Sequence, residues 1–144
     1  MAKFKTLKGL GDALIRIAEK SEVNVHEGVR KAALVTDQVA VVLTPVDTGY
    51  ARSHWAASLG EPVAGETGVQ KGIEVGEAAA TAIALSQAEA EIKNWNGRGS
   101  IFLSNPLEYV KYLDEGSSEQ APKGMTAEAV HAGQSVLKEL KILD

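Results

Sequence analysis

The chain of 144 residues contains no cysteine, which excludes disulfide bonds, cysteine-based zinc sites and a thiol nucleophile. Aromatic residues make up only 5% of it, so a core has to be built mainly from valine, leucine, isoleucine and alanine. No segment approaches the roughly 18 consecutive apolar residues of a membrane span, and the first residues lack the pattern of a signal peptide. We therefore expect a soluble protein that is made in the cytosol and has no contact with a membrane.

Basic charge is also scarce. The 15 lysine and arginine residues are outnumbered by 19 aspartates and glutamates, which gives a formal net charge of −4. Proteins whose main task is to coat nucleic acid neutralise many phosphates and carry a basic surface. The charge balance argues against that class and leaves room only for a local basic patch.

What the sequence does contain is typical of a globular protein, with 44% hydrophobic and 24% charged residues. At about 100–200 residues per domain, the length predicts a single domain over 1–144. We divide it into a helical arm over 1–44 and an α+β body over 45–144. Within the body, the glycine-rich segment 60–76 is expected to form a hairpin or a long mobile loop.

Apolar residues recur at helical spacing in two parts of the arm. The first part is Phe4 to Ile17, and the second begins at Asn24, which forms a capping-box pattern with Glu27. Charged residues of the second part, Asp37 among them, are expected on other faces than its apolar stripe. That stripe consists of Val25, Val29, Ala32, Thr36, Ala40 and Leu43. The arm is thus predicted to be a long N-terminal helix or a helical hairpin.

The body alternates between strand-like and helical segments. Strands are predicted over 50–59 and 100–104, and they are expected to form a small antiparallel sheet. Helices are predicted over 77–93 and 125–141, with one or two further helical turns at 107–115. The predicted fold class is therefore α+β, with a C-terminal helix.

Few residues carry catalytic or metal-binding chemistry. The three histidines, His26, His54 and His131, show no metal-ligand spacing, so positions in the packing or on the surface are expected for them. The segment 65–72 has glycines and a lysine, but not at the spacing of a phosphate-binding loop. We therefore predict no catalytic residue, no cofactor and no metal, and we expect a structural or binding role and not an enzyme.

A turn motif follows the arm and contains Asp47, Thr48 and Gly49, then Arg52 and Trp55. Asp47 and Thr48 can hydrogen-bond the backbone of a chain reversal, and Gly49 can adopt the positive φ that such a reversal needs. Arg52 is a candidate to pair with Asp47 or with an acidic group on a neighbouring subunit. A purely structural turn and a subunit interface both remain open at this point.

A second motif follows the predicted strand at 100–104. Its candidate interface residues are Tyr109, Tyr112, Gly116, Pro122 and Gly124. Because Tyr109 and Tyr112 are three positions apart, a helix places them on one face, where we expect them in the core or in a groove. The segment 116–124 suits an interface loop, and an ordinary surface loop is the alternative.

Together, the two motifs and the closing helix resemble the tail-component proteins of tailed bacteriophages. This group includes the phage lambda tail completion protein Z and other small head-tail joining proteins. The resemblance covers about residues 25–140, and the order and spacing of the motifs agree. The chain departs from the group at Ala51, where leucine is usual, and in the helical segment 77–93, where strands are common.

The resemblance implies a structural virion protein at the neck or upper tail, acting as a head-tail connector or tail completion protein through ring assembly and docking. The implied partners are copies of itself in a ring and neighbouring portal, adaptor, tail-tube or terminator proteins, with genomic DNA only as passing cargo. Synthesis in the host bacterial cytoplasm and a final location in the virion follow. Open alternatives are a tail-tube or other capsid-associated subunit, a small nucleotide-binding regulator or hydrolase, and a helical interaction module.

Overall fold

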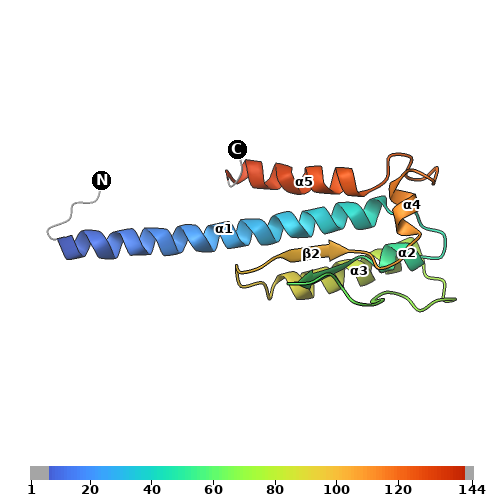
Figure 1. Cartoon of the computed structure of the whole chain (residues 1–144), viewed down its shortest axis with the longest axis horizontal. Coiled ribbons are helices and arrows are strands. Elements are labelled where there is room, and N and C mark those ends of the chain that lie inside the picture. Colours follow the sequence, from blue (N-terminus) through green and yellow to red (C-terminus); the bar gives the residue numbers. More distant parts are fainter. Residues whose placement is uncertain (1–6, 142–144) are drawn as a thin grey trace.

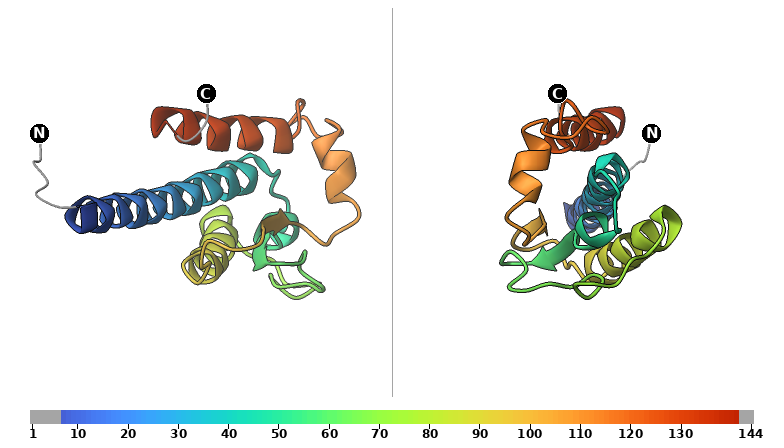
Figure 2. Two further views of the ribbon diagram at one scale, coloured as in Figure 1. Left: turned by 60° about the vertical axis from the view of Figure 1, so that its left-hand side comes forward. Right: turned by 90° about the vertical axis from the view of Figure 1, so that its right-hand side faces the viewer.

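A long helix forms the middle layer of the molecule. The structure, a computed structural model, describes residues 7–141, with side chains from Asn24 onward. Its elements are α1 (Leu7–Leu43), α2 (Tyr50–Ser53), β1 (Ala56–Leu59), α3 (Glu77–Ile92), β2 (Ile101–Ser104), α4 (Val110–Asp114) and α5 (Thr126–Glu139). α5 lies along one side of α1, and α3 with the two strands lies along the other (Figures 1 and 2). The predicted α+β class, with long first and last helices and a small antiparallel sheet, is confirmed.

α1 is one uninterrupted helix of 37 residues, about 55 Å long at 1.5 Å per residue. The prediction that a second helix starts at Asn24 is wrong, because Asn24 lies within α1. Residues 18–23 contain neither proline nor glycine, so nothing in the sequence forces the helix to stop there. The predicted start at Phe4 lies outside the described residues. The N-terminal part of α1 extends beyond the rest of the fold (Figure 1).

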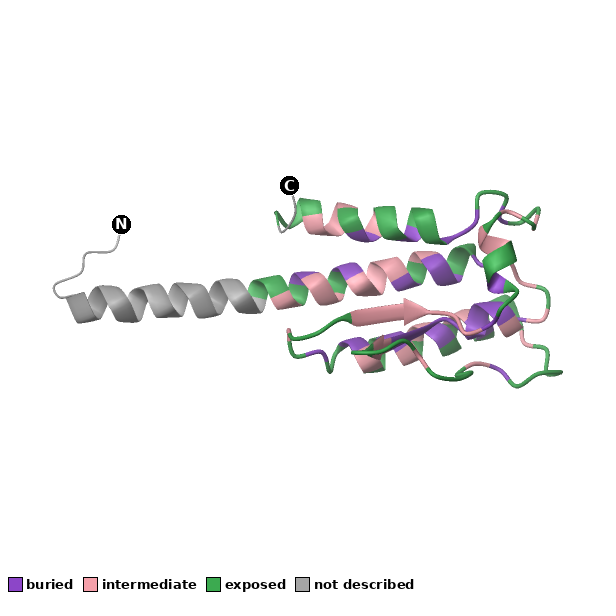
Figure 3. Cartoon of the chain, viewed as in Figure 1, coloured by how far each residue is buried: buried purple, intermediate pink, exposed green. Residues whose placement is uncertain are grey.

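The remaining part of α1 is buried on two sides (Figure 3). On the α5 side, the helices approach closely at Gly133, where a Cβ would overlap the Thr36 hydroxyl and lie 3.3 Å from the Ala32 carbonyl oxygen. Two of the predicted stripe residues, Ala32 and Ala40, are buried, whereas Val25 and Leu43 are 42% and 37% exposed. The prediction of a single buried stripe is therefore only partly right, because other parts of the fold pack against this helix on two sides.

On the other side, α3 meets α1 with a row of small side chains. Ala80, Ala84, Ala88 and Ile92 are four residues apart, share one helical face and are all 0% exposed. Ala84 packs in the cluster that includes Val41 of α1, and alanine at this position lets the two backbones come close. The predicted helix at 77–93 is confirmed, with a buried face made mostly of alanine.

The two strands pair antiparallel, with Ala56 opposite Ser104 and Leu59 opposite Ile101. The predicted strand at 50–59 is right only in its second half, because Tyr50–Ser53 forms the single-turn helix α2. The segment 60–76 forms a loop and not a hairpin, as no strand pairing occurs in it. This loop is attached at two points, by Val69 N–H to Ser53 Oγ (3.0 Å) and by Val75 N–H to the Thr48 carbonyl oxygen (2.9 Å).

Candidate functional site

The guanidinium of Arg52 closes the C-terminal end of α1. Its Nη2 donates to the carbonyl oxygens of Val42 (2.7 Å) and Thr44 (2.9 Å), and its Nε also donates to Thr44 (3.0 Å). Its Nη1 donates to Glu77 Oε1 (3.1 Å) and to Thr81 Oγ1 (3.2 Å) at the start of α3. Arg52 is only 6% exposed. Within the described chain it therefore stabilises the fold, and its acidic partner is Glu77, where sequence analysis had suggested Asp47 or a neighbouring subunit.

Trp55 is joined to the same end of α1. Its indole Nε1 donates to Thr44 Oγ1 (2.7 Å), and the Thr44 hydroxyl donates in turn to the Ala40 carbonyl oxygen (2.6 Å). Thr44 is 0% exposed and Trp55 is 5% exposed. Both side chains have their polar groups satisfied inside the protein, so Trp55 serves as a core residue of the body.

The turn at Asp47, Thr48 and Gly49 is held against the loop that precedes α3. Gly49 has a φ of 83°, and a Cβ at this position would lie 2.5 Å from Val75 Cγ2 and 2.8 Å from the Val75 carbonyl oxygen. Only glycine combines that backbone conformation with that close approach. Asp47 itself is exposed. In this turn, Gly49 therefore has a structural role, whereas the carboxylate of Asp47 is accessible.

The second motif folds back onto the end of α4. Gly116 and Gly124 have φ values of 93° and 74°, and a Cβ on either would overlap a backbone carbonyl oxygen, that of Pro122 or of Asp114. The Asp114 carboxylate accepts hydrogen bonds from Met125 N–H (2.9 Å), Thr126 N–H (2.8 Å) and Thr126 Oγ1 (2.6 Å). It therefore caps α5. Although burial opposes the effect, these three bonds together hold the pKa of Asp114 below its ordinary value.

The structure brings the two motifs together at one end of the molecule. Val46 N–H donates to Gln120 Oε1 (3.1 Å), which ties the turn at 45–49 to the loop at 116–124. Thr48 and Tyr109 also line the same pocket. Tyr112 instead lines a different pocket, beside Trp55 and Thr126. Tyr109 and Tyr112 are 42% and 59% exposed, so the core alternative is wrong for both and the groove alternative is right.

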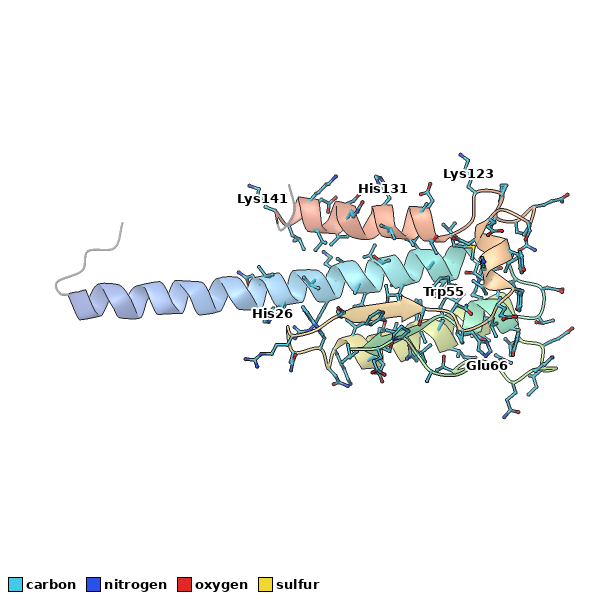
Figure 4. The ribbon with its side chains drawn as sticks, in the orientation of Figure 1. His26, Trp55, Glu66, Lys123, His131 and Lys141 are labelled. Atoms are coloured by element: carbon cyan, nitrogen blue, oxygen red, sulfur yellow. The ribbon has the colours of Figure 1, made fainter. Side chains whose placement is uncertain are left out.

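A pocket at this end has a volume of about 780 Å³. We call it the Tyr50–Tyr109 pocket, after the two tyrosines that line it. Three glutamates and a single lysine also line it, namely Glu66, Glu74, Glu108 and Lys71. Glu66 comes from the 60–76 loop, which Figure 4 places below α2, far from the N-terminal end of α1. The pocket is therefore an acidic hollow flanked by aromatic rings.

Behind Glu66, the side chains of Tyr50 and His54 make a connected set. The Tyr50 hydroxyl donates to Glu66 Oε2 (2.6 Å), which raises the pKa of Tyr50 to about 12. His54 Nδ1 lies 2.6 Å from the Tyr50 carbonyl oxygen, and its Nε2 lies 3.5 Å from Glu66 Oε2. His54 is 0% exposed, so the prediction of a packing role for it is confirmed. Glu66 was not predicted from the sequence, because a lone glutamate in a glycine-rich loop has no distinguishing spacing.

The negative charges around the pocket also act on the hydroxyl group of Tyr109. Burial first, and then the negative charges of Asp47 and Glu66, raise the pKa of Tyr109. Two carboxylates from separate segments thus lie close enough to the ring to affect its hydroxyl. This places Asp47 beside the pocket even though it does not line it.

Asp37, in the middle of α1, is a second position that sequence analysis misplaced. It is 0% exposed, where a solvated face was expected, and among the described residues neither carboxylate oxygen has a hydrogen-bond partner. Burial raises its pKa to about 7. It follows Ala33 and Leu34 on the face of α1 that packs toward α3 and the sheet.

Other kinds of site are not found in the described residues. No group of three or more histidine, cysteine, aspartate or glutamate side chains there is arranged to hold a metal ion. The helices from residue 7 to residue 141 include none that is long and apolar enough to cross a bilayer. Comparisons of the chain with known protein families, curated proteins and solved structures gave no match.

Proposed function

We propose that this chain is a structural subunit of a tailed bacteriophage virion, acting at the neck or upper tail as a head-tail connector or tail completion protein. Its activity is assembly and docking, without catalysis. The supporting observation is the separation of two features, an arm that extends beyond the fold at one end and a pocketed motif surface at the other. A subunit of this shape offers different surfaces to the neighbours on its two sides, as head-to-tail rings require.

The roles of the motif residues also support this proposal. Arg52, Trp55 and Gly49 are used to hold the body together, because their polar groups and backbone geometry are satisfied within the chain. Asp47 and Tyr109 remain accessible beside the pocket. At this end of the body, the inner residues are therefore fixed by contacts within the chain, and the outer residues are available for docking.

The partners in this proposal are copies of the same chain in a ring and the adjoining portal, adaptor, tail-tube or terminator proteins. Genomic DNA would pass the ring as cargo. With a net charge of −4, the subunit has no excess of positive charge with which to hold the phosphates of the passing DNA. The protein would be made in the host cytoplasm and incorporated into the virion.

Quantitative mass spectrometry of purified particles tests the proposal. The measured quantity is the number of copies of this chain relative to the major capsid protein. A few to about a dozen copies, as closed cyclic symmetry gives, would support a neck or tail-end ring. A much higher number would favour a tail-tube or capsid-associated subunit instead, and absence from the particle would refute a virion role.

A further inference from the structure

The lining of the Tyr50–Tyr109 pocket suits a positively charged side chain. Glu66, Glu74 and Glu108 outnumber the single cation, Lys71, and Asp47 lies close by. Carboxylates attract an ammonium group by charge, and the faces of tyrosine rings attract it through their quadrupole. A pocket of about 780 Å³ holds an extended lysine side chain together with part of its backbone.

A hydrogen bond from Tyr50, which lines the pocket, holds one of these carboxylates in place. Glu66 Oε2 accepts the hydrogen bond from Tyr50, and His54 Nε2 faces the same oxygen at 3.5 Å. His54 is 0% exposed, and its Nε2 has no hydrogen-bond partner in the described chain. The hydrogen bond from the tyrosine hydroxyl therefore orients Glu66 before any ligand arrives, which reduces the entropy that binding would cost.

The chain itself contains a short segment whose positive charge is opposite to that of the pocket. Lys3, Lys5 and Lys8 fall within the first eleven residues, which contain no acidic residue, although the whole chain has a net charge of −4. The most basic short segment and the acidic pocket are therefore both encoded in one polypeptide. Complementary charges of this kind set the register and direction of an interface.

The basic segment cannot reach the pocket of its own molecule. α1 separates them with a rod of 37 residues, about 55 Å long. The six residues before Leu7 span at most about 20 Å when fully extended. The pocket lies past the far end of α1, since Thr48 and Tyr50 come directly after it (Figures 1 and 4). An occupant with these lysines has to come from another copy.

We propose that the lysine-bearing N-terminal segment of one copy docks into the Tyr50–Tyr109 pocket of the next copy, head to tail. This inference rests on the proposed function only in taking a second copy as the partner. It assigns the pocket a ligand class, a lysine-rich peptide segment, and it gives the ring contact a direction. Because the two surfaces differ, the contact is heterologous and propagates from copy to copy.

Charge reversal on the full-length chain tests the proposal. The association constant is measured by sedimentation equilibrium for the wild type and three triple variants. The first reverses the arm (Lys3→Glu, Lys5→Glu, Lys8→Glu), and the second reverses the pocket (Glu66→Lys, Glu74→Lys, Glu108→Lys). The third is the control for the arm variant, with the same change in net charge placed at exposed lysines of the body (Lys93→Glu, Lys123→Glu, Lys138→Glu).

We expect the arm variant and the pocket variant to associate at least about tenfold more weakly than the wild type, and the control to change little. Combining the arm and pocket reversals restores association, because the charges are again complementary. Raising the salt concentration weakens the wild-type contact, since exposed charges are screened. Tyr109→Ala provides a pocket variant that leaves the Tyr50, His54 and Glu66 contacts intact, and it also weakens association.

Two results would overturn the inference. One is association that survives the arm reversal and Tyr109→Ala, which leaves the ring proposal standing with a different contact. The other is a wild-type chain that stays monomeric up to about 1 mM, too weak for a specific contact of this kind. Neither result depends on the particle measurement, so failure of the docking contact and failure of the virion role are distinguished.

Discussion

Two buried polar residues, Asp37 in α1 and Thr44 directly after its last residue, differ sharply in the number of hydrogen bonds that they make. Thr44, at the end of the helix, is surrounded by partners, with hydrogen bonds to Ala40, Trp55 and Arg52. Asp37, two turns earlier, is equally buried, and neither of its oxygens has a hydrogen-bond partner in the part of the chain that the structure describes. α1 therefore ends in a fully bonded network, and its middle contains an isolated carboxyl group.

A buried polar group in this fold contributes to stability where it is hydrogen-bonded, and not where it has no partner. At the Thr44 end, each donor has an acceptor, so the network specifies how α1, α2 and α3 meet. At Asp37, the carboxyl group gains nothing from its burial and is held in the core by the surrounding apolar contacts. Removing hydrogen bonds from the network at Thr44 should therefore destabilise the protein. Replacing the Asp37 carboxyl group by a neutral group should stabilise it at high pH.

The largest expected effect is that of Arg52→Ala, which leaves the carbonyl oxygens of Val42 and Thr44 without their donor. We expect a loss of about 3–5 kcal/mol in the free energy of unfolding, measured by urea denaturation. Arg52→Lys is the matched control. A lysine keeps the charge but cannot reach acceptors on α1 and α3 together, so it should recover only part of the loss. Full stability in Arg52→Ala would show that the network is not structural.

Asp37→Asn should have the next largest effect, and its sign depends on pH. Because the pKa of Asp37 is raised to about 7, the folded protein keeps a proton that the unfolded chain releases near pH 4. The stability that this proton contributes is complete below about pH 4 and is lost as the pH rises to about 7. Relative to the wild type, Asp37→Asn should therefore be roughly 4 kcal/mol more stable at pH 8 and similar at pH 4.

Urea denaturation of both proteins from pH 4 to pH 8 measures this difference, and comparing the two removes the contribution of every other titrating group. A constant difference across that range would show that Asp37 is ionised in the folded state or is reached by water. Asp37→Leu is a useful companion, since an apolar side chain of similar size also removes the charge.

A smaller effect is expected from removing the Thr44 hydroxyl. Thr44→Val keeps the shape but leaves Trp55 Nε1–H without an acceptor, which should cost about 1–2 kcal/mol. Trp55→Phe removes the donor, and the double variant should lose less than the sum of the two. The double-mutant cycle gives the coupling energy, and a value near zero would contradict a hydrogen bond between these side chains.

The smallest expected effect concerns Asp114, a carboxylate with three donors and thus the opposite of Asp37. Asp114→Ala should cost about 1 kcal/mol at pH 7 through loss of the cap on α5. Since the pKa of Asp114 is lowered in the folded state, this contribution is present at neutral pH and disappears as the pH falls through that pKa. Opposite pH trends for the Asp37 and Asp114 variants would confirm the contrast, and parallel trends would refute it.

The sequence predicted the regular elements of the body well where several local signals agreed. The helix at 77–92 consists mostly of strong helix formers, and the strand at 101–104 is a short apolar run closed by Asn105-Pro106. The one-turn helix at Tyr50–Ser53 was missed because four residues are too few for a helical period to be recognised. Its position depends on Arg52 reaching back to α1, a contact that no local pattern encodes.

The candidate site was predictable only in part. Gly49 stood out because glycine beside turn residues indicates positive φ, and it adopts a φ of 83°. Gly116 and Gly124 also have positive φ, although they were singled out only as candidate interface residues. Glu66 and Asp37 did not stand out, since a charged residue is expected in water unless its tertiary surroundings say otherwise. Those surroundings come from segments distant in the sequence, the 60–76 loop for the pocket and α3 for Asp37.

The continuity of α1 also has a mechanical consequence. An uninterrupted helix about 55 Å long acts as a stiff lever whose inner half is clamped between α5 and α3. Turning the body by about 5° moves the far tip by roughly 5 Å, about one helical turn. A force on the N-terminal end of α1 therefore acts as a torque on the alanine-lined contact between α1 and α3, because α1 has no break at which it could bend.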